Sequence, residues 1–438
     1  MKPAQSDAEP RPSADRAPVL DDLQKQTFSY FRREYNPDTG LIADKTRDGC
    51  PGSICATGFG LTCYPVAVEH GWMEREEAIH RTLTLLRFLQ NAEQSQSPQA
   101  TGYKGFYYHF LDLHSGKRAW HSELSTIDTA FLLSGALAAA QYFDHDTEEE
   151  QEIRDIADHL YRRVDWRWAL NHSATLSHGW KPEHGFLKSR WQGYDESLLL
   201  YILALGSPTH PLEPENYEAT VADYAWRNVY GYDYVYAGPL FVHQYPHVWL
   251  DLHEIQNDYI REKGIDYFEN SRRATHIHQQ YAIHNPKQFA GYGEFFWGIT
   301  ASDGPGPRTT KVDGIERTFF DYLARGVPDG PDDGTIAPWA VVSSLPFAPE
   351  IVLDTIRYFN SLNLQDPNPY GYKATINREY PHDGAAYGWI SKYHYGINQG
   401  PVVLMIENYQ SEFVWRLMRG CEPLRRGLRR AGFRGGWL

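Results

Sequence analysis

The chain has 438 residues, of which 42% are hydrophobic and 22% are charged, and its formal net charge is −14. A negative balance disfavours nucleic acid as a partner, because a phosphate backbone attracts a basic surface. No apolar run approaches the ~18 residues of a membrane span, so no membrane partner is expected. Four cysteines without a CxxC pair predict neither a disulfide framework nor a zinc site.

The two ends of the chain differ from its middle. Residues 1–17 are rich in Pro, Ala and Asp and are predicted to be a disordered tail, and the Gly- and Arg-rich residues 421–438 are predicted to be a loose basic tail. Residues 18–420 contain no linker-like run, which predicts a single domain. The first twenty residues lack the apolar core of a secretory signal, so the sequence as written predicts a cytoplasmic protein.

Helical periodicity dominates the middle of the chain. Ser122–Phe143 is apolar almost all round, which is typical of a buried helix, whereas Thr147–Val164 has one polar face. Apolar helices tend to precede amphipathic ones, and no repeat supports a solenoid. We therefore expect an all-α fold, an (α/α)6 toroid with a few short β-strands in loops. The other predicted helices are Asp21–Tyr35, Gly58–His70, Glu74–Ala92, Tyr194–Leu205, Pro214–Val229, Pro246–Lys263, Tyr267–Ile283, Thr335–Ser344, Ala348–Asn360 and Pro401–Arg419, and the predicted strands are Gly105–Asp112, Thr175–Trp180 and Tyr234–Val242.

Aromatic residues make up 14% of the chain, with 30 Tyr, 20 Phe and 13 Trp. Sugars present flat C–H faces and a rim of hydroxyls, so sugar sites combine aromatic rings with hydrogen-bonding groups. Trp120 stands beside His121 and Glu123, and Trp191 stands beside Gln192. Most of the aromatic residues are expected to fill a large core, and these interleaved ones are candidate sugar platforms.

The first acidic segment is Ser122–Thr129, which opens the apolar helix predicted above. Ser125 and Asp128 have the spacing of a capping box, which is a purely structural interpretation. A carboxylate at a helix N-terminus is also held ionised by the free N–H groups. Asp128 and Glu123 are therefore candidates for a base, a nucleophile or an electrostatic stabiliser.

The second acidic segment, Trp191–Ser197, precedes another leucine-rich helix. Asp195 and Glu196 are adjacent and point in different directions, so at most one of them faces a central pocket. The purely structural interpretation is again that these two acids stabilise the N-terminus of the helix that follows. Glu196 follows Tyr194 and precedes the leucines, where desolvation would raise its pKa, as a general acid for a glycosidic oxygen requires. Two carboxyl groups in unlike environments are the minimum apparatus of a glycosidase.

A third segment, Phe241–Glu254, is rich in histidine. His243, His247 and Asp251 are four residues apart, the spacing of metal ligands on one helix face. Pro246 interrupts that helix and no HExxH motif is present, so contacts to sugar from His243, Gln244 and His247 are favoured over a metal. No metal or cofactor is expected.

Further along the chain, a turn at Asp303 follows Trp297, and the Gly/Pro-rich loop from Gly304 to Gly334 is long enough to cover a pocket. Gln399 and Glu407 belong to the last apolar helix. The sequence contains no GxSxG, P-loop or GxGxxG motif, so serine-hydrolase, nucleotide and dinucleotide sites have no support.

Several of these segments occur in the order found in one family. The sequence resembles the bacterial glycoamylase-like proteins, which include β-1,2-glucanases and β-1,2-glucooligosaccharide sophorohydrolases, over about residues 20–420. The resemblance implies an (α/α)6 barrel, hydrolysis of β-1,2-glucosidic bonds with inversion, and a β-glucan or glucooligosaccharide substrate. Related domains perform transglycosylation, and members are often periplasmic. The matching segments are Ser122–Thr129, Gly193–Glu196, Gly238–Gln244, Trp297–Pro305, Asp333–Pro338, Asn398–Pro401 and Met405–Tyr409.

Carried over to this chain, the resemblance implies Glu196 as general acid, and Asp128 or Glu123 as base or substrate-positioning acid. A transglycosylase, an epimerase or lyase on the same barrel, and a non-catalytic sugar-binding protein are the alternatives. The residues expected to contact substrate are Trp120, Trp191, Tyr194, His243, Gln244, His247, Trp249, Trp297, Asp303, Gln399 and Glu407.

Overall fold

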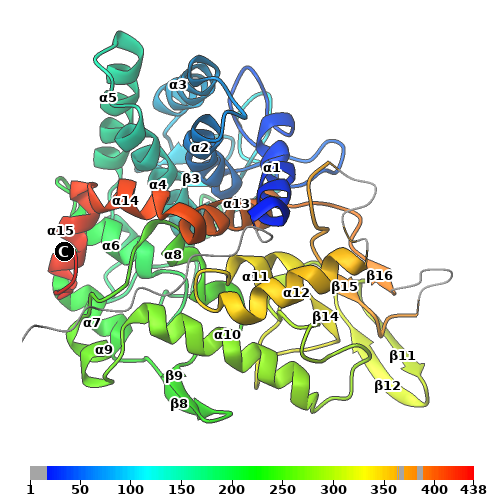
Figure 1. The fold of residues 1–438 in the computed structure, drawn as a ribbon. Coiled ribbons are helices and arrows are strands. Elements are labelled where there is room, and N and C mark those ends of the chain that lie inside the picture. The colour runs from blue at the N-terminus through cyan, green and yellow to red at the C-terminus, as the bar shows by residue number, and fades with distance from the viewer. Residues whose placement is uncertain (1–16, 363, 365–368, 382–387) are drawn as a thin grey trace, which may run out of the picture.

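The computed structural model describes residues 17–362, 364, 369–381 and 388–438. Residues 1–16 of the tail predicted for residues 1–17 lie outside the described residues, and Ala17 begins the first helix. Helices dominate the described chain and the strands are short (Figure 1), which confirms a helix-rich fold with few strands. Among the described helices, none combines the length and the apolar character that crossing a bilayer requires. The closed toroid itself stays a prediction.

Six of the described helices are buried along at least three quarters of their length: α2 (Ile54–Glu69), α4 (Thr126–Tyr142), α6 (Leu198–Gly206), α8 (Tyr245–Trp249), α11 (Pro338–Ser343) and α13 (Gly396–Ser411). Helix α4 packs against both α2 and α6, and α13 packs against both α2 and α11. Their sequences are apolar all round because each helix has protein on every side.

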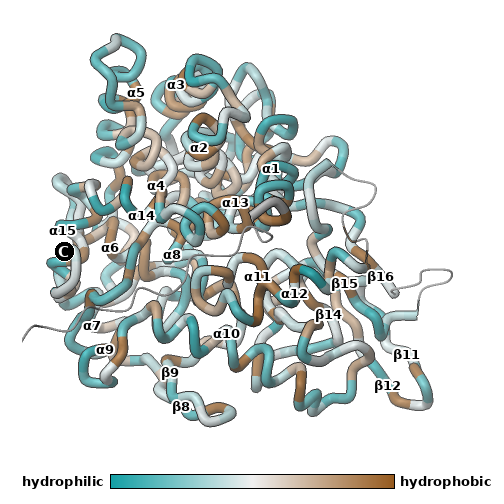
Figure 2. The backbone as a smooth tube through the Cα atoms, in the orientation of Figure 1, coloured by the Kyte–Doolittle hydropathy of each residue, from teal (hydrophilic) through white to brown (hydrophobic). Residues whose placement is uncertain are grey.

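Amphipathic helices cover this buried set: α1 (Ala17–Arg33), α3 (Arg75–Asn91), α5 (Glu148–Arg163), α10 (Tyr267–His284) and α12 (Pro349–Ser361). Helix α1 packs on α13, α5 on α4, and α12 on α11. Figure 2 shows hydrophilic and hydrophobic residues side by side on α3 and α5, as expected for helices with one solvated face. These helices lie within one to four residues of their predicted ends.

Three predicted helices are broken, which corrects the prediction. Pro214–Val229 is α7 (Pro214–Val221) followed by the hairpin of β8 (Trp226–Val229) and β9 (Tyr232–Val235). Pro246–Lys263 divides into α8 (Tyr245–Trp249) and α9 (Asp258–Glu262), with Asn257 capping the second. Pro401–Arg419 divides into α13 and α14 (Phe413–Arg419), because Glu412 between them adopts a left-handed conformation.

The C-terminal segment is not loose, in contrast to the prediction. Residues Glu422–Arg430 form α15, which packs on α6, with Leu424 and Leu428 buried. The two backbones approach closely at Gly427, where a Cβ atom would lie 1.9 Å from the carbonyl oxygen of Ile202. Leucines four residues apart bury one face of this Arg-rich helix.

The strands position the loops between helices. One antiparallel sheet has the order β2-β3-β5-β6-β7 and leads directly into α4. The predicted strands Gly105–Asp112 and Thr175–Trp180 overlap β3, β4 and β6, whereas Tyr234–Val242 is strand only at its start and ends in a 3₁₀ turn, Leu240–His243. The strands are β1 Gly52–Ser53, β2 Gly102–Tyr103, β3 Phe106–Tyr108, β4 Phe110–Leu111, β5 Leu124–Ser125, β6 Gly179–Lys181, β7 Gly185–Phe186, β10 Ala301–Ser302, β11 Arg308–Val312, β12 Ile315–Phe319, β13 Leu323–Ala324, β14 Thr335–Ile336, β15 Ile376–Asn377 and β16 Trp389–Ile390.

Candidate active site

Six of the described helices begin at the wall of one cavity of ≈ 180 Å³. They are α2, α4, α6, α8, α11 and α13, and each contributes a residue from its first turn or from the turn that precedes it. The free N–H groups of these first turns give the cavity a partial positive field, which favours carboxylate ions. The lining residues are Cys55, His109, Ile127, Asp128, Phe131, Glu196, Phe241, Tyr245, Ala301, Tyr322, Trp339 and Ile397.

Asp128 lies in the first turn of α4 and is 8% exposed, towards the cavity. Ser125 caps the helix by accepting a hydrogen bond from the Asp128 N–H at 3.2 Å, and its Oγ donates to Asp128 Oδ2 at 2.5 Å. The predicted capping arrangement is therefore present, and the same contacts hold the carboxylate in one orientation at the cavity. Hydrogen bonds of this kind favour the ionised form of an acid.

Glu196 lies two residues before α6 and is half-buried at the cavity wall. Burial raises the pKa of Glu196 well above its usual range, and the negative charge of Asp195 raises it further. Asp195 does not line this cavity, and its Oδ1 accepts a hydrogen bond from the Ser197 N–H at 2.9 Å. The two neighbouring acids thus differ as expected: one faces the cavity and the other holds the turn into α6.

His109, the single residue between β3 and β4, places an imidazole ring between two acids. Its Nδ1 lies 2.9 Å from Oε1 of Glu123, and its Nε2 lies 3.6 Å from Oδ2 of Asp128. Burial alone would lower the pKa of His109, but the two carboxylates outweigh it and raise the pKa to about 9. Burial alone would raise the pKa of Glu123, but the hydrogen bond to His109 outweighs it and the pKa is lowered to about 2. Glu123 therefore faces His109 and does not line the cavity.

Tyr322 also reaches the cavity, from the long loop between Gly304 and Gly334. Its side chain is 54% exposed, and burial of its hydroxyl and the nearby carboxylates of Asp44 and Glu196 raise its pKa. The loop is fixed at its base by Arg325, which donates to Asp333 Oδ1 at 2.7 Å with both side chains fully buried. The loop was predicted to cover a pocket, but no motif singled out Tyr322.

Trp339, at the start of α11, is a second lining residue that no motif indicated. Its ring is 3% exposed, and among the described residues its Nε1–H has no hydrogen-bond partner. Buried donors normally have partners, so this N–H is an exception beside the cavity that the ring helps to line.

Four of the residues predicted to contact sugar lie outside the lining of this cavity. Trp120 is 54% exposed and packs on Phe110, with its ring 5.9 Å from Lys45 Nζ. Trp191 is buried and its Nε1–H donates to Thr126 Oγ1 at 2.9 Å, which ties it to the start of α4. The remaining two follow: Tyr194 is buried against Tyr224 and Tyr267, and Asp303 accepts a hydrogen bond from Ser391 at 2.7 Å.

The other predicted contacts also lie outside the lining of this cavity, and their side chains are buried in the core. Glu407 lies in the later turns of α13, where it binds His70 Nε2 at 2.7 Å and Gln24 Nε2 at 3.0 Å. The rest lie in the core: Gln244 donates to Ala340 O, His247 pairs with Ser271, Trp249 with Thr62 and Trp297 with Thr355, while His243 packs near Asn270 and Gln399 is buried in the first turn of α13. The apolar sequence around them indicated burial as strongly as it indicated sugar binding.

One group of side chains in the described part of the chain could hold a metal ion, namely His109, Glu123 and Asp128, whose ligand atoms lie within 4.8 Å of one another. It is not the set weighed from the sequence, since His243, His247 and Asp251 each have separate partners. A proton and a metal ion compete for the same imidazole lone pair, so His109 can offer this group one or the other.

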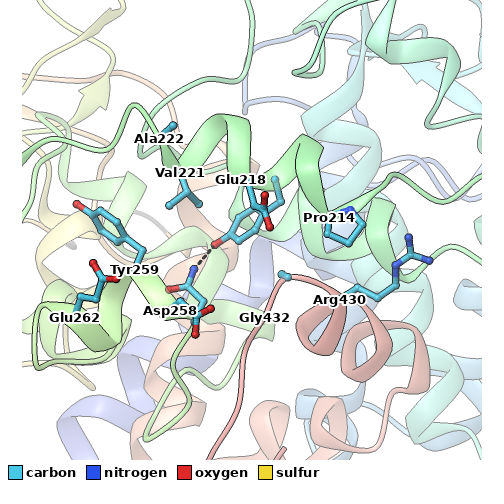
Figure 3. Close-up of a pocket in the computed structure, with 12 residues that line it drawn as sticks. Pro214, Glu218, Val221, Ala222, Asp258, Tyr259, Glu262, Arg430 and Gly432 are labelled. Carbon is cyan, nitrogen blue, oxygen red and sulfur yellow. Dashed lines mark hydrogen bonds between the residues drawn. The ribbon is translucent and has the colours of Figure 1, made fainter.

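A larger hollow of ≈ 470 Å³ lies elsewhere, between α7, α9 and the end of α15 (Figure 3). Its acids Glu218, Asp258 and Glu262 are exposed, and Arg430 donates out of it to the Leu212 carbonyl oxygen. All three carboxyl groups are open to solvent, so their surroundings do not set one apart as an acid and another as a base. The smaller cavity therefore has the stronger claim to chemistry.

The buried helices and the cavity define a helix-rich protein that carries two unlike carboxyl groups, one hydrogen-bonded and one desolvated, at a single site. The Glycoamylase family model, described as "Putative glucoamylase", matches residues 188–422. The chain belongs to this family, which confirms the resemblance found in the sequence.

Individual relatives share this fold along nearly the whole chain. A putative glucoamylase from Bacteroides uniformis is 31% identical, with 98% of this chain and 100% of that chain covered and a TM-score of 0.85. An endo-β-1,2-glucanase from Chitinophaga pinensis is 28% identical, with coverages of 98% and 100% and a TM-score of 0.83. An exo β-1,2-glucooligosaccharide sophorohydrolase (non-reducing end) from Parabacteroides distasonis is 28% identical over 94% of this chain. The chain spans 57% of the length of that curated relative.

Proposed function

We propose that this protein is a glycoside hydrolase that cleaves β-1,2-glucosidic bonds in β-1,2-glucan or its oligosaccharides. The observation that carries the proposal is the pair Asp128 and Glu196, which line one cavity in opposite electrostatic environments. A pair of carboxyl groups whose environments separate their proton affinities is what acid–base cleavage of a glycosidic bond requires. The substrate class follows the relatives that are named for β-1,2-glucan and its oligosaccharides.

Each acid takes the role that its surroundings favour. Glu196, protonated at neutral pH, donates its proton to the glycosidic oxygen as the bond breaks. Asp128 accepts a proton from the water that attacks the anomeric carbon from the opposite face. This arrangement inverts the anomeric configuration and needs about 6.5–9.5 Å between the two carboxyl groups. The buried helices close into an (α/α)6 toroid in this proposal, with the cavity at its axis.

Aromatic groups around the cavity supply the contacts to sugar. Tyr322 and Trp120 offer exposed ring faces on which the C–H face of glucose packs. Trp339 adds an apolar ring to the wall of the cavity, where it can pack against sugar.

The substrate is tested by incubating the protein with linear β-1,2-glucan, starch and cellulose in parallel. Chromatography of the products is expected to show glucooligosaccharides from β-1,2-glucan and none from the other two. Short oligosaccharides of one size indicate cleavage from a chain end, and a ladder of sizes indicates internal cleavage. Release from starch with β-1,2-glucan untouched contradicts the proposal.

The two-acid mechanism makes a further expectation about metals and stereochemistry. Activity should persist in EDTA, because protonated His109 already balances the carboxylates around it. The first product observed by NMR should carry the α-anomeric configuration, because inversion of a β bond gives an α product. A metal requirement restored by calcium or zinc, or a β-configured first product, would overturn this mechanism.

A further inference from the structure

His109 is fixed by its backbone as well as by its ring. Its N–H donates to the carbonyl oxygen of Glu123 at 2.9 Å, and its own carbonyl oxygen accepts from the N–H of Ile54, the first residue of α2. The ring is stacked on Phe110 with the centroids 3.9 Å apart and an interplanar angle of 13°. The imidazole therefore holds one orientation, with Nδ1 towards Glu123 and Nε2 towards Asp128.

The two contacts together favour a proton on each ring nitrogen. A neutral imidazole with its N–H towards Glu123 would leave a lone pair facing Asp128. The imidazolium form donates a hydrogen bond to Glu123 and places its second N–H and its positive charge 3.6 Å from Asp128 Oδ2, an ion-pair distance. Asp44 adds a third negative charge near the ring, partly offset by Lys45, whose Nζ is 3.6 Å from Asp44 Oδ2.

The other titratable groups near His109, Glu123 and Asp128 leave the surroundings of the imidazole net negative. Lys181 lies on the Glu123 side and favours the ionised form of that acid. Cys55 and Tyr322 line the cavity with burial raising the pKa of each, so both are neutral. Glu196 is the remaining acid on the cavity wall, and its proton is retained.

We propose that His109 is a positioning residue: held by Glu123 as an imidazolium ion, it places a positive charge beside Asp128 and orients that carboxylate for activating water. Ser125 and His109 both contact Oδ2 of Asp128, so one oxygen of the carboxylate is fixed from two sides. Glu123 acts through His109 and does not itself touch the reacting atoms, which revises the prediction of a direct catalytic role for it. This inference rests on the proposed function for the part played by Asp128.

The first test is the pH dependence of kcat/KM on β-1,2-glucan for wild type, His109→Gln and Glu123→Gln. Glutamine keeps a hydrogen-bond donor at position 109 but removes the positive charge beside Asp128. Losing an opposite charge within about 4–6 Å moves a carboxyl titration by about 1–3 pH units, so the acidic limb should move upwards by that amount in His109→Gln. Glu123→Gln should move it in the same direction by less, with KM nearly unchanged in both variants.

The matched control is His145→Gln, which removes an imidazole 3.5 Å from Glu150 on α5, outside the cavity. It should leave both limbs of the profile in place. A kcat about 10²–10⁴-fold lower in Glu123→Gln with the limb unmoved would make Glu123 the base and overturn the inference. An unmoved limb in an active His109→Gln would reduce His109 to a structural residue.

The second test does not depend on turnover. In ¹⁵N-labelled wild-type protein, NMR should show both ring nitrogens of His109 protonated at pH 7, with deprotonation near pH 9. Glu123→Gln should lower that midpoint, because one of the two carboxylates that hold the proton is gone. A neutral His109 at pH 7 would refute the inference even if the protein hydrolyses β-1,2-glucan. An imidazolium ion in a protein without that activity would support the inference and refute the proposed function.

Discussion

Asp128 takes part in the N-cap of α4 and also lines the cavity. Its N–H caps onto Ser125, and its carboxylate accepts from the same serine while facing the cavity. Capping and chemistry are often weighed as rival interpretations of a Ser-x-x-Asp segment. At this residue they coexist, because the first turn of a buried helix is both where a cap is needed and where an ionised acid is stabilised.

Replacing Asp128 with Asn separates the two roles. The amide keeps the shape and can still accept from Ser125, but it cannot take a proton from water. We expect kcat to fall by about 10²–10⁴-fold, the usual scale for one acid–base group, with the melting temperature nearly unchanged. Steady-state kinetics and thermal unfolding on the same sample measure both.

The control for this variant is Thr147→Ala, which removes the N-cap of α5, where Thr147 Oγ1 accepts from the Glu150 N–H at 3.3 Å. It should cost about 1 kcal/mol of stability and leave turnover intact. Normal turnover in folded Asp128→Asn would mean that Asp128 is only a cap.

Glu196 must be protonated to donate, so its raised pKa sets the basic limb of activity. The enzyme should be active at neutral pH and lose activity as pH rises through the Glu196 pKa, which burial and then Asp195 hold high. Asp195→Asn removes the adjacent negative charge while keeping an acceptor for the Ser197 N–H. The basic limb of kcat/KM should therefore move to lower pH, and a limb that stays or moves higher would contradict the assignment.

At the scale of elements, the N-terminal ends of six helices surround the cavity. The acids at the starts of α4 and α6 were predictable, because a polar cap before a long apolar run is visible in the sequence. The ends of long helices such as α3 and α10 were also predictable from their periodicity. The break between α8 and α9 was not, since an apolar stretch with histidines fits both a long helix and two short ones.

Helix α15 shows why the C-terminal prediction failed. Its composition of Arg and Gly resembles a tail, and its burial comes from Leu424, Leu428 and from Gly427, which lets its backbone touch α6. A glycine that permits close packing cannot be told from a flexible one without its partner helix.

Because of this packing, we expect a Gly→Ala substitution in α15 to lower stability, whereas helix propensity alone would raise it. Gly→Ala inside a helix usually gains up to about 1 kcal/mol, but at Gly427 the added Cβ would lie 1.9 Å from the Ile202 carbonyl oxygen. Gly427→Ala should therefore lower the melting temperature. Gly420→Ala is the control, because its φ is −77° and the nearest atom is the flexible end of Gln141 at 3.2 Å. Equal stability of the two variants would show that α15 does not need the close approach to α6.

For the whole molecule, the sequence indicated the helix-rich fold, the family and the two acids that line the cavity. It did not indicate His109 or Tyr322, because neither residue belongs to a motif and both gain their meaning only from tertiary packing. It also overcounted sugar contacts, since Trp249, Trp297 and Glu407 satisfy their polar groups inside the core. Burial of aromatic residues and recognition of sugar leave similar patterns in a sequence.

The central claim is that Glu196 donates a proton during cleavage of β-1,2-glucosidic bonds, and one comparison tests it most directly. Reducing ends released from linear β-1,2-glucan are measured for wild type and Glu196→Gln, which keeps the side-chain shape and removes the proton donor. The account predicts release by wild type and a kcat about 10²–10⁴-fold lower in the variant with KM little changed. A folded Glu196→Gln that releases reducing ends at the wild-type rate would contradict it.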